Sequence, residues 1–343
     1  GLLRRSPGGG WSVADVPLLD EAAELLGEPV DPGAGRRTRQ EERERLEYAL
    51  GVLEIAYGSR SIDVEDEAEP DILAAHDLLD ASGLARRQEV RDHRSVAERA
   101  AADRTWLFGH VIVDEAQELS AMAWRALMRR CPSRSMTIVG DVAQTGALAG
   151  TTSWAQVLDP YVAGRWRRER LSVNYRTPAE VMEVAAPVLA AIDPGARPPR
   201  SVRRSGERPW RLRVASAELV GEVGRLVAEE ASVLGGGRLA VLVPPGRVAE
   251  LAASCGVVPA GSVPGEADLQ QPVVVLTVAQ AKGLEFDTVL VVEPQEIVSG
   301  SPRGLCDLYV ALTRATRRLG VVHSGELPGV LAGLLPREAV SAR

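Results

Sequence analysis

The sequence contains very little lysine. Its 40 basic residues include a single lysine, Lys282, and the others are arginines. A phosphate-binding loop of the form G-x-x-x-x-G-K-S/T requires a lysine followed by serine or threonine. Gly283 follows Lys282, and the nearest arginine-containing stretch, GAGRRT at 33–38, lacks the required spacing. These 343 residues therefore exclude such a loop.

Cysteines and long apolar runs are scarce as well. The three cysteines, Cys131, Cys255 and Cys306, are far apart and fit neither a disulfide framework nor a zinc spacing, which favours the cytoplasm. No apolar run approaches the roughly 18 residues that a membrane span needs, and no signal peptide is visible after Gly1. Since residue 1 is not methionine, we expect the chain to be a fragment of a longer protein.

The charge balance is acidic, with a formal net charge of -7. A protein that coats nucleic acid without sequence preference would be basic, so this class is disfavoured, although a local basic groove is compatible with the balance. Hydrophobic residues make up 45% of the chain and charged residues 25%, as in globular proteins. The length allows about two domains.

The character of the sequence changes near residue 106. Residues 1–105 are polar, and helix formers dominate the stretches at 36–58 and 71–90, which we expect to be helical. We find no chemistry-bearing pattern there and interpret the region as a helical segment or insertion. After it, short β-rich runs alternate with helical patterns, which predicts an α/β fold with a parallel sheet.

Strands are predicted at the runs HVIVDEA, SMTIVGD, RLSVNYR, RLAVLVP, VVVLTV, TVLVVEP and LGVVH, and helices at 119–131, 177–190 and 306–318. For the second helix, Thr177 can serve as the N-cap, Pro178 as the first helical residue, and Glu180 as the partner in a capping box. Val181, Val184, Val188 and Leu189 would form its apolar face. The Pro/Arg/Gly-rich stretch at 193–210 is expected to be a surface loop.

Two carboxylates stand at the end of the first predicted strand, in VIVDEAQ. Asp114 is placed to hold Mg²⁺, directly or through water, and Glu115 to orient and deprotonate an attacking water. Taken alone, the pattern is weak. A strand that runs into the acidic start of a helix would look the same, because the helix dipole favours acidic residues there.

Four further segments carry candidate phosphate or nucleotide contacts. Gln144 follows the strand of TIVGDVAQT, Arg176 follows RLSVNYR, Lys282 and Gly283 occupy a turn between two strands, and Arg314 falls within the predicted helix 306–318. A helical arginine beside a nucleotide site can act as an arginine finger. Each position also has an ordinary alternative: a strand-to-loop turn, surface arginines, a lysine retained by chance, or an exposed helix face.

The order of these segments is more specific than any one of them. DEAQ, GD..Q, NYR, T....KGLEFD and LYVALTRA follow one another as motifs II to VI do in superfamily 1 helicases, and the chain resembles the UvrD/Rep branch over roughly residues 106–325. The resemblance implies two RecA-like domains that bind ATP and Mg²⁺ between them. It places 106–165 in the first domain, 166–336 in the second, and leaves 337–343 as a tail.

The resemblance also implies a role for each matching residue. It implies a Walker B pair formed by Asp114 and Glu115, a coupling role for Gln117, γ-phosphate contacts from Gln144 and Arg176, adenine stacking by Tyr175, nucleotide-site positions at Lys282 and Gly283, a ribose contact from Glu285, and an arginine finger at Arg314.

Three departures from the family pattern stand out. Motif I, the phosphate-binding loop, is absent. No aromatic residue follows Gln144 until Trp154, whereas family members that unwind DNA stack bases on aromatics here, worth about 1–3 kcal/mol per base. Ala279 also stands where the family often has a DNA-contacting histidine. We therefore do not expect translocation on single-stranded DNA by base stacking.

Within superfamily 1, the stretches 11–27, 103–145 and 171–182 resemble HelD-type proteins, which use ATP to remodel or release RNA polymerase. Three hypotheses follow. The chain is the C-terminal part of such an ATP-driven motor, a polymerase-binding paralogue that does not hydrolyse ATP, or a DNA helicase of the UvrD/Rep type. The retained γ-phosphate residues favour the first, in which the upstream part supplies the phosphate-binding loop.

Overall fold

The computed structural model describes residues 11–27, 95–103, 105–257 and 271–338, with a few isolated positions between 40 and 51. The chain divides into two compact units, residues 1–106 and 107–343. In the first unit, α1 spans Val16–Leu26 and α4 spans Val96–Ala102. The helix expected at 71–90 lies outside the described residues, and so does most of that expected at 36–58. In the described part, no helix is long and apolar enough to span a membrane.

The second unit begins with a small parallel sheet. Strand β1 (Val111–Val113) pairs in register with β2 (Met136–Ile138). Helices α5 (Ala121–Arg130) and α6 (Trp154–Val162) accompany it. Val113, Ala116, Trp124, Met128 and Leu158 form its buried core. We call residues 107–162 the small lobe.

A six-stranded sheet, entirely parallel, organises the rest of the unit, in the order β10-β5-β9-β8-β6-β7. We call residues 171–338 the large lobe. The strands are β5 (Trp210–Arg213), β6 (Leu239–Val243), β7 (Val273–Thr277), β8 (Phe286–Val292), β9 (Ala315–His323) and β10 (Leu335–Pro336). A separate two-stranded sheet joins β3 (Val173–Asn174) to β4 (Arg200–Ser201).

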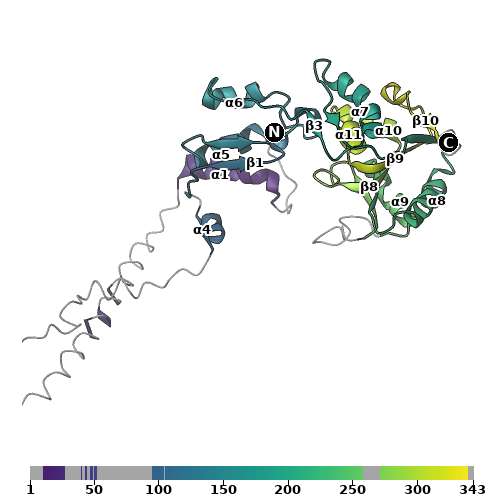
Figure 1. Cartoon of the computed structure of the whole chain (residues 1–343). Helices are drawn as coiled ribbons and strands as arrows, with labels where there is room; N and C mark the ends of the chain where they lie inside the picture. Colours follow the sequence, from purple (N-terminus) through teal and green to yellow (C-terminus); the bar gives the residue numbers. More distant parts are fainter. Residues whose placement is uncertain are drawn as a thin grey trace, which may run out of the picture. The chain divides into compact units, whose positions relative to one another are not determined.

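Helices cover both faces of the large sheet (Figure 1). Helices α7 (Ala179–Ile192), α10 (Pro294–Ser299) and α11 (Gly304–Thr313) contribute to one core cluster. Helices α8 (Leu219–Ser232) and α9 (Val248–Ser254) contribute to the other. Because neither face meets water, the central strands read as continuous apolar runs, and every residue of β6 is buried. The predicted α/β fold class with a parallel sheet is confirmed, and it is consistent with a RecA-like helicase domain.

All three predicted helices have boundaries that differ from the prediction, and at two of these boundaries the role of a residue changes. Helix α7 begins at Ala179 with Pro178 as its N-cap, not Thr177. The Thr177 amide bonds Asn174 Oδ1 at 3.0 Å, and the Glu180 carboxylate accepts the amides of Ser205 and Gly206 instead of closing a capping box. The apolar face of α7 is confirmed, since Val181, Val188 and Leu189 are buried and Val184 packs on the same core.

The end of α11 is the second correction. The sequence predicts helix through residue 318 with Arg314 in its middle, but α11 ends at Thr313 and Arg314 is its C-cap. Strand β9 begins at Ala315, which pairs with Phe286 of β8. Pairing with β8 therefore overrides the local helical preference of these residues.

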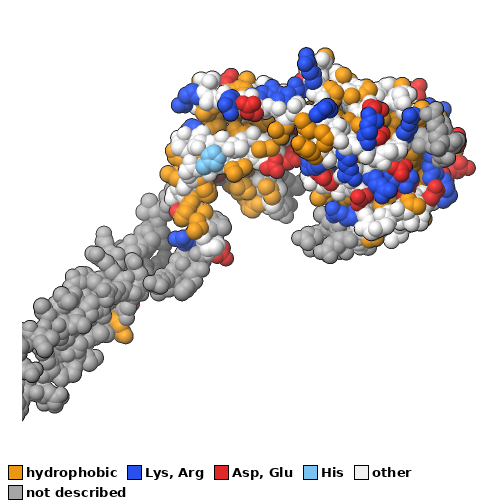
Figure 2. Space-filling view, in the orientation of Figure 1, with side chains coloured by type: hydrophobic (Ala, Val, Ile, Leu, Met, Phe, Trp, Pro, Cys, Tyr) orange, Lys and Arg blue, Asp and Glu red, His pale blue; other side chains and the backbone are white. Residues whose placement is uncertain are grey.

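The stretch at 193–210 is also more ordered than predicted. It contains β4 and ends at Trp210, the first residue of β5. Trp210 is buried beside Gly320 of β9, a contact that the surrounding prolines and arginines hide from a sequence reading. Strand β5 was missed for this reason, and the short strands β4 and β10 were not predicted either. On the visible face of residues 107–338, basic and acidic side chains are intermixed, without a continuous basic surface there (Figure 2).

Gly320 offers a test of the packing of the large sheet. A Cβ at this position would lie 2.4 Å from Trp210 Cζ2 and 2.8 Å from Leu290 Cδ2. We expect Gly320→Ala to lower the free energy of unfolding in urea by about 1–3 kcal/mol, because the added methyl overpacks the core. Gly329→Ala is the control, since nothing lies within 4 Å of its Cβ position. Equal stability of the two variants would show that the packing around Gly320 is wrong.

Candidate nucleotide site

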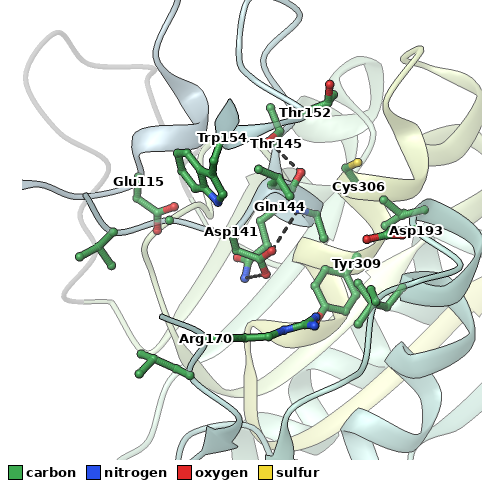
Figure 3. Close-up of a pocket in the computed structure, with 18 of the residues that line it drawn as sticks. Glu115, Asp141, Gln144, Thr145, Thr152, Trp154, Arg170, Asp193, Cys306 and Tyr309 are labelled. Atoms are coloured by element: carbon green, nitrogen blue, oxygen red, sulfur yellow. Dashed lines mark hydrogen bonds between the residues drawn. The ribbon is translucent and has the colours of Figure 1, made fainter. Parts of the chain in front are cut away.

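A large open cleft lies within residues 107–338, between the small lobe and the large lobe. Figure 3 looks into it: Glu115 stands on one side, Tyr309 and Arg170 on the other, and Asp141 and Gln144 between them. The cleft is lined by eight of the sequence-predicted residues, namely Asp114, Glu115, Gln144, Tyr175, Arg176, Gly283, Glu285 and Arg314. Gln117 and Lys282 lie behind this lining.

The carboxylate pair follows β1 directly. Asp114 Oδ1 accepts the Glu115 amide at 2.9 Å, and Glu115 has a left-handed backbone with φ of 49°. Such a conformation costs a non-glycine residue of order 1–3 kcal/mol and persists only where its surroundings enforce it. Here the turn is held by the Ala116 amide, which donates to the Val139 carbonyl at 3.0 Å. The turn directs both carboxylates to the cleft.

Gln117 is almost fully buried and links the two strand ends. Its Nε2 donates to Glu115 Oε2 at 2.6 Å, and its Oε1 accepts the Asp141 amide at 3.0 Å. The link requires Gly140, because a Cβ there would lie 2.3 Å from Gln117 Oε1 and 2.9 Å from Trp154 Cη2. The side chain of Gln117 therefore orients Glu115 from behind the cleft.

A chain of hydrogen bonds runs from the small lobe to the large lobe. Asp141 Oδ2 accepts from Gln144 Nε2 at 3.0 Å, and Gln144 Oε1 accepts from Arg314 Nη2 at 3.0 Å. Arg314 Nη1 also donates to the Leu284 carbonyl at 3.3 Å. Both ends of the Gln144 amide are thus fixed, and Arg314 reaches across from the end of α11.

Arg314 is a buried cation that lines the cleft, with only 6% of its surface exposed. Burial lowers its pKa, while the carboxylate of Glu115 opposes that shift and the nearby charge of Arg176 reinforces it. Its Nε has no hydrogen-bond partner in the described structure. A buried, charged donor without a partner is unfavourable, so an anion that reached this group would stabilise it.

Arg176 and Glu285 form an ion pair at the mouth of the cleft. Asn174 Oδ1 accepts the Arg176 amide at 2.9 Å, which fixes the turn after β3. Tyr175 is 72% exposed. A phosphate contact by Arg176, a ribose contact by Glu285 and adenine stacking by Tyr175 all stay predictions. The ion pair would have to break before Arg176 could contact a phosphate or Glu285 a ribose.

Lys282 does not face the cleft. Its Nζ donates to Glu118 Oε1 of the small lobe at 2.7 Å. Gly283 follows it with φ of 74°, a left-handed conformation that favours glycine. A nucleotide contact by Lys282 stays a prediction, and its ammonium already has a carboxylate partner.

The carboxylates at the cleft fit Mg²⁺ that is bound together with a nucleotide. The described residues contain no cluster of three or more metal-ligating side chains. Mg²⁺ usually keeps several waters and takes one or two carboxylates together with substrate phosphates. Asp114, exposed at the end of β1 and lining the cleft, can supply such a carboxylate.

Sequence reasoning missed Asp141, Tyr309 and Glu118. Asp141 follows a predicted strand, but its role depends on the hydrogen bond from Gln144, three residues later. Tyr309 is buried next to the cleft, and burial together with the charge of Asp141 raises its pKa to about 12. Glu118 directly follows DEAQ, yet its partner is 164 positions away in the chain. Of the three, only Glu118 has no pattern in the neighbouring sequence that indicates its role.

Comparisons with known proteins agree with this picture at the level of the domain. Residues 272–322, which run from β7 to β9, match the model of the UvrD-like helicase C-terminal domain. This segment is therefore similar to the C-terminal domain of UvrD-like helicases. No curated protein sequence matches the chain.

Three solved structures are similar to parts of the chain. One is the C-terminal domain of a possible DNA helicase from Lactobacillus plantarum WCFS1, with 21% identity and a TM-score of 0.36, covering 46% of this chain and 92% of that one. The PRRSV helicase has 16% identity and a TM-score of 0.36, covering 62% and 34%. Arterivirus nonstructural protein 10, a helicase, has 15% and 0.35, covering 65% and 40%. The chain spans less than half of either viral helicase.

The Gln117 link can be tested through Gly140. We expect Gly140→Ala to displace the Gln117 side chain, because the new methyl would overlap Gln117 Oε1. Hydrogen exchange at the amides of Asp141 and Ala116 should then be faster than in the parent chain. Gly109→Ala, with nothing within 4 Å of its Cβ position, is the matched control. Unchanged exchange in Gly140→Ala would contradict the link.

Proposed function

We propose that the chain is the C-terminal part of an ATP-hydrolysing superfamily 1 motor. The observation that carries the proposal is Arg314, a buried guanidinium with an unpartnered Nε that lines the cleft and is bonded to Gln144. The order of the motifs and the UvrD-like match at 272–322 support it.

The roles of the residues follow from their positions. Glu115 orients and deprotonates the attacking water, and the bond from Gln117 Nε2 leaves its other carboxylate oxygen for that water. Arg314 and Arg176 neutralise the charge that develops on the transferred phosphoryl group. Gln144 connects this charge change to Asp141 through its fixed amide. Asp114 would hold Mg²⁺, which supplies charge neutralisation on the phosphate oxygens when bound.

The chain by itself lacks the loop that cradles the phosphates. A G-x-x-x-x-G-K-S/T loop supplies backbone amides and a lysine to the β- and γ-phosphates, and none is present in the 343 residues. Without them, the carboxylates of Asp114 and Glu115 face an anionic substrate with less positive charge to hold it. We therefore expect the chain alone to show no ATP turnover above background.

The turnover experiment uses two proteins. Phosphate release is measured for the chain alone and for a protein that joins it to a phosphate-binding loop. In the second protein, Arg314→Ala should lower kcat by about 10³–10⁵-fold, as loss of an arginine finger does, and Glu115→Gln should abolish turnover. Arg317→Ala, an exposed arginine three residues later, is the control. Unchanged turnover in Arg314→Ala would remove Arg314 from the site.

We further propose that the motor is of the HelD type and acts on RNA polymerase. The support is the resemblance in sequence at 11–27, 103–145 and 171–182, together with the missing aromatics after Gln144. The alternatives are a DNA helicase of the UvrD/Rep type and a polymerase-binding paralogue that does not hydrolyse ATP.

Binding measurements separate these alternatives. For the chain, we expect measurable binding to purified bacterial RNA polymerase. Binding to single-stranded DNA should be weak and steeply salt-dependent, carried by arginine–phosphate contacts rather than stacking. A tight, salt-resistant complex with single-stranded DNA and no binding to the polymerase would favour the DNA helicase. Polymerase binding without turnover, once a phosphate-binding loop is joined, would favour the paralogue.

A further inference from the structure

The single lysine of the chain lies where the small lobe meets the large lobe. Lys282 follows β7, and its Nζ donates at 2.7 Å to Glu118 Oε1, in the short helical turn at Ala116–Glu118 of the small lobe. The two side chains are 23% and 25% exposed. A pair that is shielded in this way is screened by salt much less than an exposed one.

Glu118 also fastens the loop at 145–151, which we call the bridging loop. Its Oε1 accepts the Gly146 amide at 3.0 Å and its Oε2 accepts the Ala147 amide at 3.1 Å. At the other end of the loop, Arg303 Nη2 donates to the Gly150 carbonyl at 2.9 Å. Lys282, through Glu118, and Arg303 therefore tie both ends of the bridging loop to the large lobe.

A second carboxylate meets the lysine at Gly146. A Cβ on Gly146 would lie 2.5 Å from Lys282 Nζ and 2.4 Å from Asp307 Oδ1, so both side chains converge on this glycine. Burial raises the pKa of Asp307, and the charge of Lys282 counteracts that shift. One ammonium thus serves as the counterion of Glu118 and Asp307 together.

We propose that Lys282, Glu118 and Asp307 form a charged junction that positions Gln144 against Arg314. The bridging loop begins directly after Gln144, and Asp307 lies in the first turn of α11, whose C-cap is Arg314. Every contact in the junction joins two protein groups, so it forms without nucleotide. The proposal rests on the proposed function for the role of the cleft, but not for the junction itself.

The junction also explains why this position is a lysine in a chain otherwise rich in arginine. The ammonium is compact, whereas a guanidinium is a planar fork that needs more room. Lys282 Nζ lies against Gly146, since a Cβ there would be only 2.5 Å away, and a guanidinium would have to fit in the same place. Lys282 and Glu118 are accordingly positioning residues, which act on the cleft through the bridging loop.

Hydrogen exchange of the chain without nucleotide tests the junction. We expect Lys282→Met and Gly146→Ala to speed exchange of the bridging-loop amides about tenfold or more, the factor that loss of one charge-assisted hydrogen bond represents. Gly146→Ala changes no charge, and the backbone of Gly146 does not have a positive φ, so the substitution causes no backbone strain. Its effect therefore reports on packing, whereas that of Lys282→Met also reports on charge. Exchange in β6 and β8 should not change, which shows that the fold is retained. Glu250→Gln, which breaks the more exposed pair of Glu250 with Arg247, is the control.

The single side-chain amine provides a second measurement. Acetylation of Lys282 by an amine-reactive ester is followed by mass spectrometry, with the α-amine as internal reference. We expect Glu118→Gln to raise the rate at Lys282 several-fold and Glu250→Gln to leave it unchanged.

Three results would overturn the proposal. The first is an unchanged bridging loop in both Lys282→Met and Gly146→Ala. The second is an acetylation rate that is insensitive to Glu118→Gln. The third is an effect of Lys282→Met that arises only when Mg-ATP is added to a protein with a phosphate-binding loop, which would make Lys282 a nucleotide ligand. Absence of ATP turnover in a protein that joins the chain to a phosphate-binding loop would contradict the proposed function but would not affect the junction.

Discussion

The hydrogen bond between Arg314 Nη2 and Gln144 Oε1 is the interaction on which the cleft depends. A buried guanidinium is stable only if its donors are matched by acceptors. Gln144 and the Leu284 carbonyl supply two of these acceptors, and the carboxylates of Glu115 and Glu285 supply a favourable field. Among its other N–H groups, Nε is buried and has no hydrogen-bond partner in the described structure. The rest of the site can be understood as the support that this bond requires.

That support is built from the ends of strands. The left-handed turn at Glu115 follows β1, Asp141 follows β2, and Ala315 starts β9 immediately after Arg314. The large sheet, which is covered on both faces, fixes the start of β9, because its strands cannot shift without exposing their apolar runs. The ends of β1 and β2 are held together by the bond from the Ala116 amide to the Val139 carbonyl and by the side chain of Gln117. Side chains placed there keep their geometry, whereas side chains on long loops would not. The proposed junction at Lys282 extends this support to the bridging loop, whose first residue, Thr145, lines the cleft.

The sequence predicted the fold class and most of the central strands, because β6, β7 and β8 are continuous apolar runs bounded by turn residues. It failed where pairing between distant segments decides the structure. Arg314 was placed inside a helix because the residues after it are good helix formers, yet these residues form strand β9, which pairs with β8. Thr177 was expected to cap α7, but Asn174 takes its amide.

The candidate site divides in the same way. The motif residues that line the cleft were found by their order along the chain. The partners of these residues were not, because Glu118 with Lys282 and Gln144 with Arg314 are contacts over 164 and 170 positions. Nothing local distinguishes Glu118 from an ordinary surface glutamate. The roles that we propose for the lining residues in nucleotide chemistry rest on their geometry and on the family resemblance together.

We propose that Arg314 contacts the γ-phosphate of a bound nucleotide. The most direct measurement is the Nε–H NMR resonance of Arg314, assigned by its loss in Arg314→Lys, in a protein that joins this chain to a phosphate-binding loop. We expect a non-hydrolysable Mg-ATP analogue to shift this resonance and to slow its exchange with water, and Mg-ADP to do so far less. An Nε–H resonance that responds to neither nucleotide, although both bind, would contradict a γ-phosphate contact by Arg314.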